Sequence, residues 1–338
     1  MTKNLMKRTL TRRAIVLALT AATALTALPA MAQQKTVLKL GWTTSDGVQD
    51  PYAVGARDFK KAVEEGSAGR IEVQLFPNRQ LGDEKAMLDG MRLGTVDAGI
   101  ITNAVVAQIE PAFQVVDLPF LFANEAQAQK VLDGPLGQKL AAKLETKGIK
   151  LLSFMEGGFR DMINNVRPVE KPEDVKGVKY RVMQNPVFIG MFSSLGGNAV
   201  PMAWGETFTA VQQGAIDGLE IPLAVIDQNK FFEVTKYLSL TNHTYSAIDL
   251  VISKRVFDKL PDDLKKVVLS SAASATKAQR LTADANAKQL VAKLEAAGMK
   301  VNRIENFKPF RDSVQGVYEQ FKPTIGPDIL QEALTAVQ

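Results

Sequence analysis

The stretch from Asn198 to Pro222 reads NAVPMAWGETFTAVQQGAIDGLEIP and carries the local signals that decide the fold. Residues 206–213 have the spacing of a helix, and residues 215–220 predict a strand with a turn inside it. A helix that leads directly into a strand is the repeating unit of α/β proteins. This stretch therefore predicts an α/β fold.

The N-terminal part of the chain shows the same alternation of segments. Strand-like and helical segments follow one another at residues 37–42, 52–65, 71–76, 83–93 and 97–102. A βαβαβ order favours parallel strands, because each helix returns the chain to the starting edge of the sheet. We therefore expect a mostly parallel sheet with helices on both faces.

The C-terminal part adds strand-like segments at residues 149–154, 177–182 and 250–253, and a helix at residues 185–195. The helical pattern from Leu264 to Ala297 contains almost no helix breaker. An unbroken helix of this length would span roughly 50 Å. The pattern predicts either one strut that contacts two lobes or two helices with a bend.

A chain of 338 residues suits two domains of ~150 residues each. The sequence shows no internal repeat and no disordered linker, so the chain is expected to cross several times between two α/β lobes. Clefts between such lobes are common binding sites for small ligands.

The composition excludes several classes of protein and site. Hydrophobic residues make up 46% and charged residues 23% of the chain, which is typical of globular proteins and excludes low-complexity disorder or a multispan membrane protein. Cysteine is absent, which excludes disulfides, thiolate metal sites and a cysteine nucleophile. The single histidine, His243, excludes a His-rich metal centre. We expect no metal site and no cofactor.

Residues 1–32 are predicted to form a secretory signal peptide. Cationic residues precede an uncharged run from Ala14 to Leu28, and a small-x-small triplet ends at Ala32. The run is shorter than the ~20 residues that span a bilayer, so cleavage after Ala32 is expected rather than a membrane anchor. The pair Arg12-Arg13 leaves Sec and twin-arginine export open. The mature chain, residues 33–338, is expected in the periplasm.

The net charge of +5 belongs to this leader. Without its five cations, the chain has 36 basic and 36 acidic residues. The mature chain therefore lacks the cationic bias of nucleic-acid-binding proteins, and no nucleic-acid partner is expected.

Common catalytic motifs are absent from the sequence. There is no Walker lysine loop, G-x-G-x-x-G, G-x-S-x-G or H-E-x-x-H. Paired acids such as Asp83-Glu84 carry no weight among 36 acidic residues. His243 could act as a base only with a partner that the sequence does not supply, and a hydrogen-bonded histidine between the lobes is the simpler interpretation. No catalytic residue is predicted.

Two arginines, Arg160 and Arg181, each follow a strand-like segment where an end facing a cleft would lie. A guanidinium group matches the geometry of a carboxylate and stays charged when buried. A surface salt bridge is the alternative for each of them. These observations alone indicate an exported two-lobe α/β protein and favour a binding function.

Several long motifs resemble the DctP-type substrate-binding proteins of TRAP transporters. The stretch 198–222 is similar to the signature of that family, and KGVKYRV at residues 176–182 resembles its arginine strand. LFPNRQLGD at residues 75–83 and DLPFLF at residues 117–122 resemble its N-terminal lobe. FFEV from Phe231 and LPDDL from Leu260 resemble its later segments, so the resemblance covers the whole mature chain in order.

This resemblance implies a two-lobe periplasmic-binding-protein fold of the α/β class, in which a long helix crosses both lobes. It implies lobes formed by residues 33–157 plus 247–286 and by residues 158–246 plus 287–338. It also implies a monomer that closes on a small organic acid and delivers it to the small and large membrane subunits of a TRAP permease.

The resemblance also implies a set of ligand-binding residues. Arg181 falls at the family arginine that pairs with the ligand carboxylate, and Arg160 at a second pocket arginine. The family often has Asn where this chain has Ile221, so one polar contact is missing here. The other positions implied are the aromatic Trp204 and, in the N-terminal lobe, Trp42, Thr43, Thr102 and Asn103.

These residues predict the class of ligand. Two arginines lie at one end of the expected cleft, and only hydrogen-bonding groups lie at the other. Trp204 and Ile221 form an apolar wall, which penalises a second buried charge. We expect a small hydroxy or oxo monocarboxylate rather than a dicarboxylate or a sialic-acid-sized sugar. An aromatic monocarboxylate stacked on Trp204 is the second choice, and a purely structural role of Trp204 at the hinge is the third interpretation.

Two other functions fit the same scaffold. An exported enzyme could use two such lobes, and so could a ligand sensor that docks on a signalling receptor. Fold analogy does not separate these functions from transport. The absence of a catalytic constellation favours binding over catalysis.

Overall fold

The computed structural model describes residues 35–338. The predicted signal peptide, residues 1–32, and its cleavage site lie outside the described residues. Within residues 35–338, no helix has both the length and the apolar character needed to cross a membrane.

The N-terminal lobe is built around three strands and the helices between them. Its first elements are β1 (Thr36–Gly41), α2 (Pro51–Gly66), β2 (Ile71–Phe76), α3 (Glu84–Leu93) and β3 (Ala98–Thr102). The next are α4 (Asn103–Val106), η1 (Pro111–Val115), α5 (Glu125–Leu132) and α6 (Pro135–Glu145). The predicted order of strands and helices is confirmed here, and the bounds differ by one or two residues.

The C-terminal lobe repeats this plan with short strands. Its elements are β5 (Lys179–Val182), α7 (Pro186–Ser194), β6 (Asn198–Pro201), α8 (Trp204–Gln212), β7 (Gly218–Pro222) and α9 (Leu223–Gln228), with the short helices η2 (Pro172–Val175) and η3 (Phe231–Glu233) at its borders. The stretch quoted first, residues 198–222, thus supplies β6, α8 and β7.

One mixed sheet runs through both lobes of the described chain, in the order β2-β1-β3-β8-β4-β7-β5-β6, with β9 (Lys300–Arg303) paired to β8. Strands within each lobe are parallel, as in the pairs β1–β3 and β5–β7. The pairs β3–β8, β4–β8 and β4–β7 are antiparallel. The expectation of a mostly parallel sheet is therefore wrong for the middle of the sheet, where two strands link the lobes in opposite directions.

These linking strands are β4 (Ile149–Asn164) and β8 (Tyr237–Ser253), which are much longer than the sequence pattern predicts. Their pairing shifts register at three places, including the step between Glu156 and Gly158. Gly158 has φ +97°, a conformation that strains other residues. Bulges of this kind bend a strand, so they mark the hinge between the lobes.

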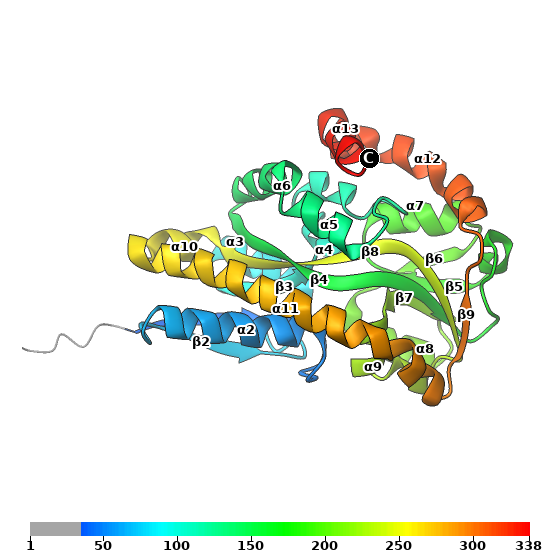
Figure 1. The fold of residues 1–338 in the computed structure, drawn as a ribbon, viewed down its shortest axis with the longest axis horizontal. Coiled ribbons are helices and arrows are strands. Elements are labelled where there is room, and N and C mark those ends of the chain that lie inside the picture. Colours follow the sequence, from blue (N-terminus) through cyan, green and yellow to red (C-terminus); the bar gives the residue numbers. More distant parts are fainter. Residues whose placement is uncertain (1–34) are drawn as a thin grey trace, which may run out of the picture. The chain divides into compact units, whose positions relative to one another are not determined.

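The helix α11 (Asp262–Ala296) is a single helix of 35 residues. It crosses the sheet diagonally and packs against α2, β4 and α9, which belong to different parts of the molecule (Figure 1). Of the two predicted alternatives, the single strut is confirmed. The short helix α10 (Lys254–Lys259) lies between β8 and α11.

The last two helices, α12 (Lys308–Ile325) and α13 (Pro327–Ala336), return to the N-terminal lobe. The helix α12 contacts α7 and η1, while α13 contacts η1 and α6 (Figure 1). The C-terminal segment therefore packs against helices of both lobes.

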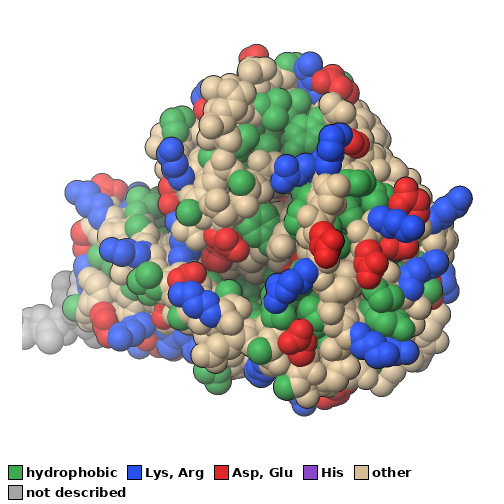
Figure 2. All heavy atoms as spheres, turned by 45° about the vertical axis from the view of Figure 1, so that its right-hand side comes forward, with side chains coloured by type: hydrophobic (Ala, Val, Ile, Leu, Met, Phe, Trp, Pro, Cys, Tyr) green, Lys and Arg blue, Asp and Glu red, His purple; other side chains and the backbone are tan. Residues whose placement is uncertain are grey.

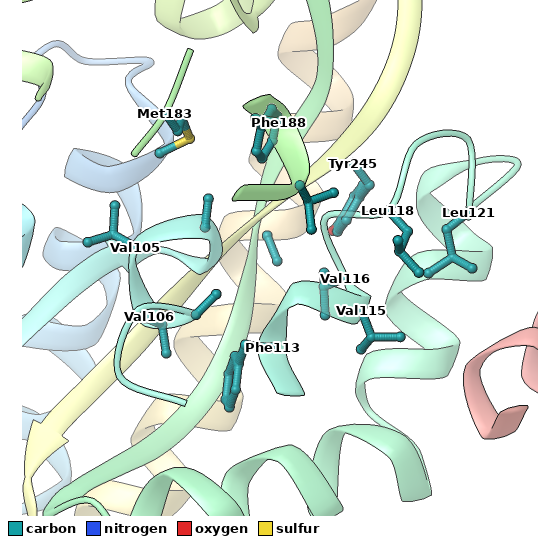
Figure 3. Packing of buried hydrophobic residues seen from close by; sticks show 14 of the residues in the cluster. Val105, Val106, Phe113, Val115, Val116, Leu118, Leu121, Met183, Phe188 and Tyr245 are labelled. Atoms are coloured by element: carbon teal, nitrogen blue, oxygen red, sulfur yellow. The ribbon is translucent and has the colours of Figure 1, made fainter. Parts of the chain in front are cut away.

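Two clusters of buried hydrophobic side chains form the core. One of them gathers side chains from α4, η1, α7 and β8, including Val105, Phe113, Phe188 and Tyr245 (Figure 3). Because this cluster contains residues of both lobes, packing as well as covalent connection holds the lobes together. The exact residue borders of the two lobes stay a prediction.

Candidate functional site

The candidate site lies where strands from the two lobes end. Thr43 follows β1 and Thr102 ends β3 in the N-terminal lobe. Arg181 is the penultimate residue of β5 and Ile221 that of β7 in the C-terminal lobe. In open α/β sheets, ligands bind outside the carboxyl ends of the strands, and this geometry brings such ends from both lobes toward each other.

Arg160 lies on β4 and is only 3% exposed. It forms a buried ion pair with Glu220 of β7, in which Nε donates to Oε2 and Nη2 donates to Oε1 at 2.9 Å. Nη2 also donates to the Glu220 backbone oxygen at 2.6 Å, and Nη1 donates to Ser246 Oγ at 3.1 Å. Burial opposes ionisation of Glu220, but the charge of Arg160 outweighs it and lowers the pKa of the carboxyl. Arg160 is therefore neutralised within the protein.

His243 joins this pair from β8. Its Nε2 lies 3.3 Å from Glu220 Oε2, and its Nδ1 lies 2.8 Å from Thr241 Oγ1. Burial lowers the pKa of His243, which favours a neutral ring that donates to Glu220 and accepts from Thr241. The expected hydrogen-bonded histidine between the lobes has this arrangement, and the partner that the sequence did not reveal is Glu220.

Arg181 differs from Arg160 although it is equally buried, with 3% of its surface exposed. Nε and Nη2 donate to the backbone oxygen of Met202 at 3.0 and 2.8 Å. No acidic residue within the described range 35–338 forms an ion pair with it. Burial lowers the pKa of Arg181 to about 10, so the guanidinium is still charged at neutral pH. Arg181 is thus a fixed, buried cation that forms no direct ion pair within residues 35–338, although the charges of Glu220 and Glu84 oppose the lowering of its pKa.

Trp204 begins α8 beside this cation. The Arg181 guanidinium lies 5.9 Å from the centroid of its ring, which suits a cation–π contact. On another side, the ring packs against Phe231 with centroids 5.4 Å apart. The half-buried Trp204 therefore contacts both the candidate site and the hydrophobic core. Ile221 is 2% exposed and belongs to the same core cluster.

The predicted residues of the N-terminal lobe have different surroundings. Trp42 is fully buried and donates Nε1–H to the Ser45 oxygen at 3.2 Å, so its ring is part of the core. Thr43 is 4% exposed. Asn103 donates Nδ2–H to the Phe113 oxygen and to Asp117 Oδ1 at 3.0 and 2.9 Å.

Thr102 connects two residues that the sequence did not single out. Its hydroxyl lies 2.7 Å from the Tyr52 hydroxyl and 2.8 Å from Glu84 Oε1. Glu84 is 7% exposed and begins α3. Burial raises the pKa of Glu84, while Thr102, Arg181 and Arg160 oppose this shift. The carboxyl group therefore lies within electrostatic reach of both arginines.

Hydrogen bonds join the two lobes on both sides of this site. On one side, Asn185 donates Nδ2–H to the Ala104 oxygen at 3.0 Å and to Asp117 Oδ2 at 2.9 Å. On the other side, Ser45 N–H donates to Asn229 Oδ1 at 3.0 Å, and Asn229 Nδ2–H donates to Asp50 Oδ2 at 3.1 Å. The lobes are therefore in contact on both sides of the site.

A cavity of about 1020 Å³ lies elsewhere, between α11, α5, α6 and the hinge part of β4. Figure 2 shows a hollow on one face, with hydrophobic side chains inside it and charged side chains around it. Arg181, Trp204, Thr43 and Thr102 do not line this cavity. We place the candidate site at Arg181, because a buried cation without a counter-ion requires a ligand more strongly than an open groove does.

The structure brings Arg160, Arg181 and Trp204 together on the C-terminal lobe, with Thr102 and Asn103 at the end of β3. Glu220, Glu84 and Tyr52 are additional polar residues of this region. Sequence reasoning missed Glu84 because an isolated Asp83-Glu84 pair resembles any other surface pair. The signal that could have identified it is its place at the start of a helix after the FPNRQLGD motif.

Residues 43–324 match the model of the family described as bacterial extracellular solute-binding protein, family 7, DctP. The chain is 36% identical over 277 residues to the 2,3-diketo-L-gulonate-binding periplasmic protein of Escherichia coli K12. This match covers 82% of this chain and 84% of the relative.

Solved structures of similar proteins have the same fold. The sugar acid binding protein of Advenella mimigardefordensis in complex with galactonate is 35% identical with a TM-score of 0.87, over 90% of this chain and 98% of the other. A TRAP periplasmic solute-binding protein of Polaromonas sp. JS666 bound to D-erythronate is 38% identical with a TM-score of 0.85, over 89% of this chain and 98% of the other.

Proposed function

Because the chain belongs to family 7 of the bacterial extracellular solute-binding proteins, the DctP family, we propose that it captures a hydroxylated monocarboxylate between its lobes. After closing on this ligand outside the cytoplasm, it delivers the ligand to the small and large membrane subunits of a TRAP permease. It acts in this scheme as a monomer and as a binding protein without a catalytic step.

The buried charge of Arg181, which forms no direct ion pair within the described residues, is the observation that supports this proposal most strongly. Removing a cation from water costs several kcal/mol unless a counter-ion pairs with it. The protein supplies two hydrogen bonds from a backbone oxygen but no counter-ion within the described residues. A ligand carboxylate would complete the site, because it accepts two parallel N–H bonds from a guanidinium.

The ion pair between Arg160 and Glu220 supports a single carboxylate in the ligand. Of the two predicted pocket arginines, only Arg181 is left to balance an anion. Three of the similar proteins agree with this charge count, since 2,3-diketo-L-gulonate, galactonate and D-erythronate each have one carboxylate and several hydroxyl or keto groups. Two others differ, because one is named for C4-dicarboxylates and one contains bound succinate. We therefore favour a sugar acid of this type over a dicarboxylate.

The other predicted ligand-binding residues are assigned roles relative to a carboxylate at Arg181. Trp204 covers Arg181 and limits its access to water, while Thr43, Thr102 and Asn103 contribute polar groups from the opposite lobe. Ile221 and Trp42 shape the site from the core side, because both are almost fully buried.

A thermal-shift screen of the mature chain against carboxylic acids tests the proposal. A ligand at 100 times its dissociation constant adds ~2.7 kcal/mol to the free energy of unfolding. We expect a sugar acid such as galactonate or D-erythronate to raise the melting temperature, and to be recovered unchanged after incubation. Conversion of the acid into a product would instead support the enzyme hypothesis.

Substitution of Arg181 tests the proposed clamp by calorimetry. Arg181→Ala should weaken the binding free energy for the best acid of the screen by about 2–5 kcal/mol, because the carboxylate is left buried and unpaired. Arg181→Lys should also lose affinity, because an ammonium group does not reproduce the planar fork. The exposed Arg167→Ala is the matched control and should bind as the wild type does. Wild-type affinity in Arg181→Ala would refute the clamp.

A further inference from the structure

The cavity of about 1020 Å³ beside the bulge of β4, here called the hinge cavity, has walls from both sides of that bulge. Leu151 and Phe154 line it before the bulge, and Phe159 and Asp161 line it after the bulge. The helices α5, α6 and α11 supply the other walls. A volume of this order, with many apolar side chains and a few polar ones, is typical of sites for small organic molecules.

Acidic residues outnumber basic residues in the lining of the hinge cavity. The five acidic residues are Glu125, Asp133, Glu156, Asp161 and Asp284. The two basic residues are Lys277, which is exposed, and Arg280. The guanidinium of Arg280 is already paired, because it donates to both carboxylate oxygens of Asp133 at 2.6 and 2.9 Å. The charge of the lining therefore favours a cation over an anion.

Two of these acids, Glu156 and Asp161, are almost completely buried, with 4% and 1% of their surface exposed. Glu156 has three donors within the protein. The side chains of Gln129 and Tyr245 donate to its Oε2 at 2.9 and 2.8 Å, and the Gly158 N–H donates to its Oε1 at 2.8 Å. The carboxyl group of Glu156 is therefore satisfied without a ligand.

Asp161 has fewer partners than Glu156. Its Oδ1 accepts from the Asn242 N–H at 3.0 Å, and only backbone N–H groups, those of Asn242 and Thr241, stabilise its charge. No basic side chain of residues 35–338 lowers its pKa, which burial raises to about 7. A carboxylate offers about four acceptor positions, so Asp161 can still accept hydrogen bonds from a cation in the hinge cavity.

The hinge cavity is separate from the candidate site. Asp161 directly follows Arg160 in β4, and successive side chains of a strand point to opposite faces. Arg160 extends to Glu220, and neither Arg160 nor Arg181 lines the hinge cavity. A ligand of the hinge cavity therefore contacts neither arginine of the candidate site.

We propose that the hinge cavity is a second binding site, which takes a small organic cation with an ammonium group and an apolar body. The ammonium group donates to Asp161, and the apolar body packs against Phe159, Pro222 and Leu223, which line the same cavity. Pro222 lies beside Asp161, because Asp161 pairs with the preceding residue of β7. The proposal does not depend on the ligand of Arg181.

Calorimetry of the full mature chain tests this site with two probes of matched size. 2-Phenylethylammonium chloride carries the charge, and 2-phenylethanol is its neutral analogue. At pH 8 the carboxyl group of Asp161 is mostly ionised and an alkylammonium group, which titrates near pH 10, is still charged. We expect the ammonium probe to bind at least about tenfold more tightly than the alcohol, because hydrogen bonds between charged groups are stronger. Equal affinities, or no binding of the ammonium probe, would overturn the proposal.

The substitution Asp161→Asn tests the assigned charge. The amide oxygen can still accept from the Asn242 N–H, but the negative charge is removed. Affinity for 2-phenylethylammonium should fall at least about tenfold, while affinity for 2-phenylethanol stays unchanged. Asp312→Asn, at an exposed acid of α12 outside the hinge cavity, is the control. If Asp161→Asn binds the ammonium probe as the wild type does, the proposal is wrong.

A pair of substitutions on α11 tests the location. Ala283 lines the hinge cavity, whereas the exposed Ala285 of the same helix does not. The indole ring in Ala283→Trp should occupy part of the cavity and weaken binding of the ammonium probe, and Ala285→Trp should bind it as the wild type does. Wild-type affinity in both variants would place the probe elsewhere and overturn the proposal.

Discussion

At the scale of single residues, Glu220 neutralises Arg160, one of the two buried arginines of the candidate site. Its carboxylate is completely buried and holds the guanidinium of Arg160 by two side-chain contacts. A second free arginine in the same site would favour a dicarboxylate. We therefore propose that this ion pair leaves Arg181 as the arginine that balances the charge of a ligand.

The substitution Glu220→Gln tests this role. Removal of one partner from a buried ion pair typically costs 3–5 kcal/mol, so the free energy of unfolding should fall by about that amount in urea denaturation. Succinate should bind more tightly than to the wild type, because Arg160 is released. Glu206→Gln, an exposed acid on α8, is the control. Unchanged stability and unchanged succinate affinity would contradict the assigned role.

Asp161 gives a prediction about pH. Burial raises the pKa of Asp161 to about 7, although a backbone hydrogen bond from Asn242 opposes the shift. The unfolded chain releases this proton near pH 4 and the folded chain near pH 7, so Asp161 makes stability fall as pH rises between these values. The stabilisation by protonated Asp161 is fully present below the pKa of the unfolded chain. It is lost as pH rises through the pKa of the folded chain.

The substitution Asp161→Asn should remove this pH dependence while its amide oxygen keeps the bond from Asn242. Relative to the wild type, the variant should gain on the order of 2–3 kcal/mol between pH 5 and pH 8, measured by chemical denaturation. Asp284→Asn, whose side chain is 77% exposed, should show no such gain. A wild-type pH profile in Asp161→Asn would show that the carboxyl group titrates normally.

The residues that the sequence alone could identify are those with a charge and a strand-end position. Arg181 and Arg160 are recognisable in this way, but their different states are not, because the partner of Arg160 lies 60 residues further along the chain. Glu84 was missed despite its place after the FPNRQLGD motif, because its contact with Thr102 joins two separate elements.

At the scale of elements, α11 is hydrogen-bonded to the bulged part of β4 by Thr276, Gln279 and Arg280, and Gln279 makes the most of these bonds. Gln279 is 1% exposed, and its Oε1 accepts from the Glu156 N–H at 3.0 Å. Its Nε2 donates to the Glu156 oxygen at 2.7 Å and to the Pro51 oxygen at 3.3 Å. The helix thereby satisfies the backbone at the bulge of β4 and contacts the start of α2.

The substitution Gln279→Ala should leave these buried backbone groups unpaired. Each unsatisfied group costs about 1–3 kcal/mol, and three groups lose a partner, so the free energy of unfolding should fall by at least about 3 kcal/mol. Lys277→Ala, an exposed position of the same helix, should change stability very little. Both variants are compared with the wild type by denaturant titration. Equal stability of the two variants would contradict the stabilising role of Gln279.

The sequence predicted helices and short strands well but not the long strands β4 and β8. Gly157 and Gly158 interrupt the hydrophobic pattern of β4, and they look like the end of a strand. In the structure they form a bulge of β4. A Cβ atom on Gly157 would lie 2.4 Å from the Ser246 backbone oxygen, so this position requires glycine. A polar run around His243 similarly conceals β8, because its buried polar groups are satisfied by tertiary contacts.

At the scale of the whole molecule, the proposed function requires lobes that close around the ligand. A ligand drives closure only if it binds the closed state more tightly than the open state. Asn185 contributes to the closed state, since its Nδ2 bridges to Asp117 and to the Ala104 oxygen. Its Oδ1 accepts from the Val187 N–H at the start of α7.

The substitution Asn185→Asp keeps this helix cap but places a second carboxylate against Asp117. The closed state should be weakened, so affinity for the best acid should fall at least tenfold, or about 1.4 kcal/mol. Small-angle scattering of Asn185→Asp should still show a smaller radius of gyration at ligand saturation than without ligand. Ser193→Ala, at an exposed site of α7, is the control. Unchanged affinity in Asn185→Asp would mean that this contact does not favour closure.

The most direct test of the account is a crystal structure of the mature chain grown with the tightest-binding sugar acid. The account predicts the carboxylate of the acid at the Arg181 guanidinium and an unbroken Arg160–Glu220 ion pair. A ligand whose carboxylate contacts neither arginine, or one that lies in the cavity between α11 and α5, would contradict it.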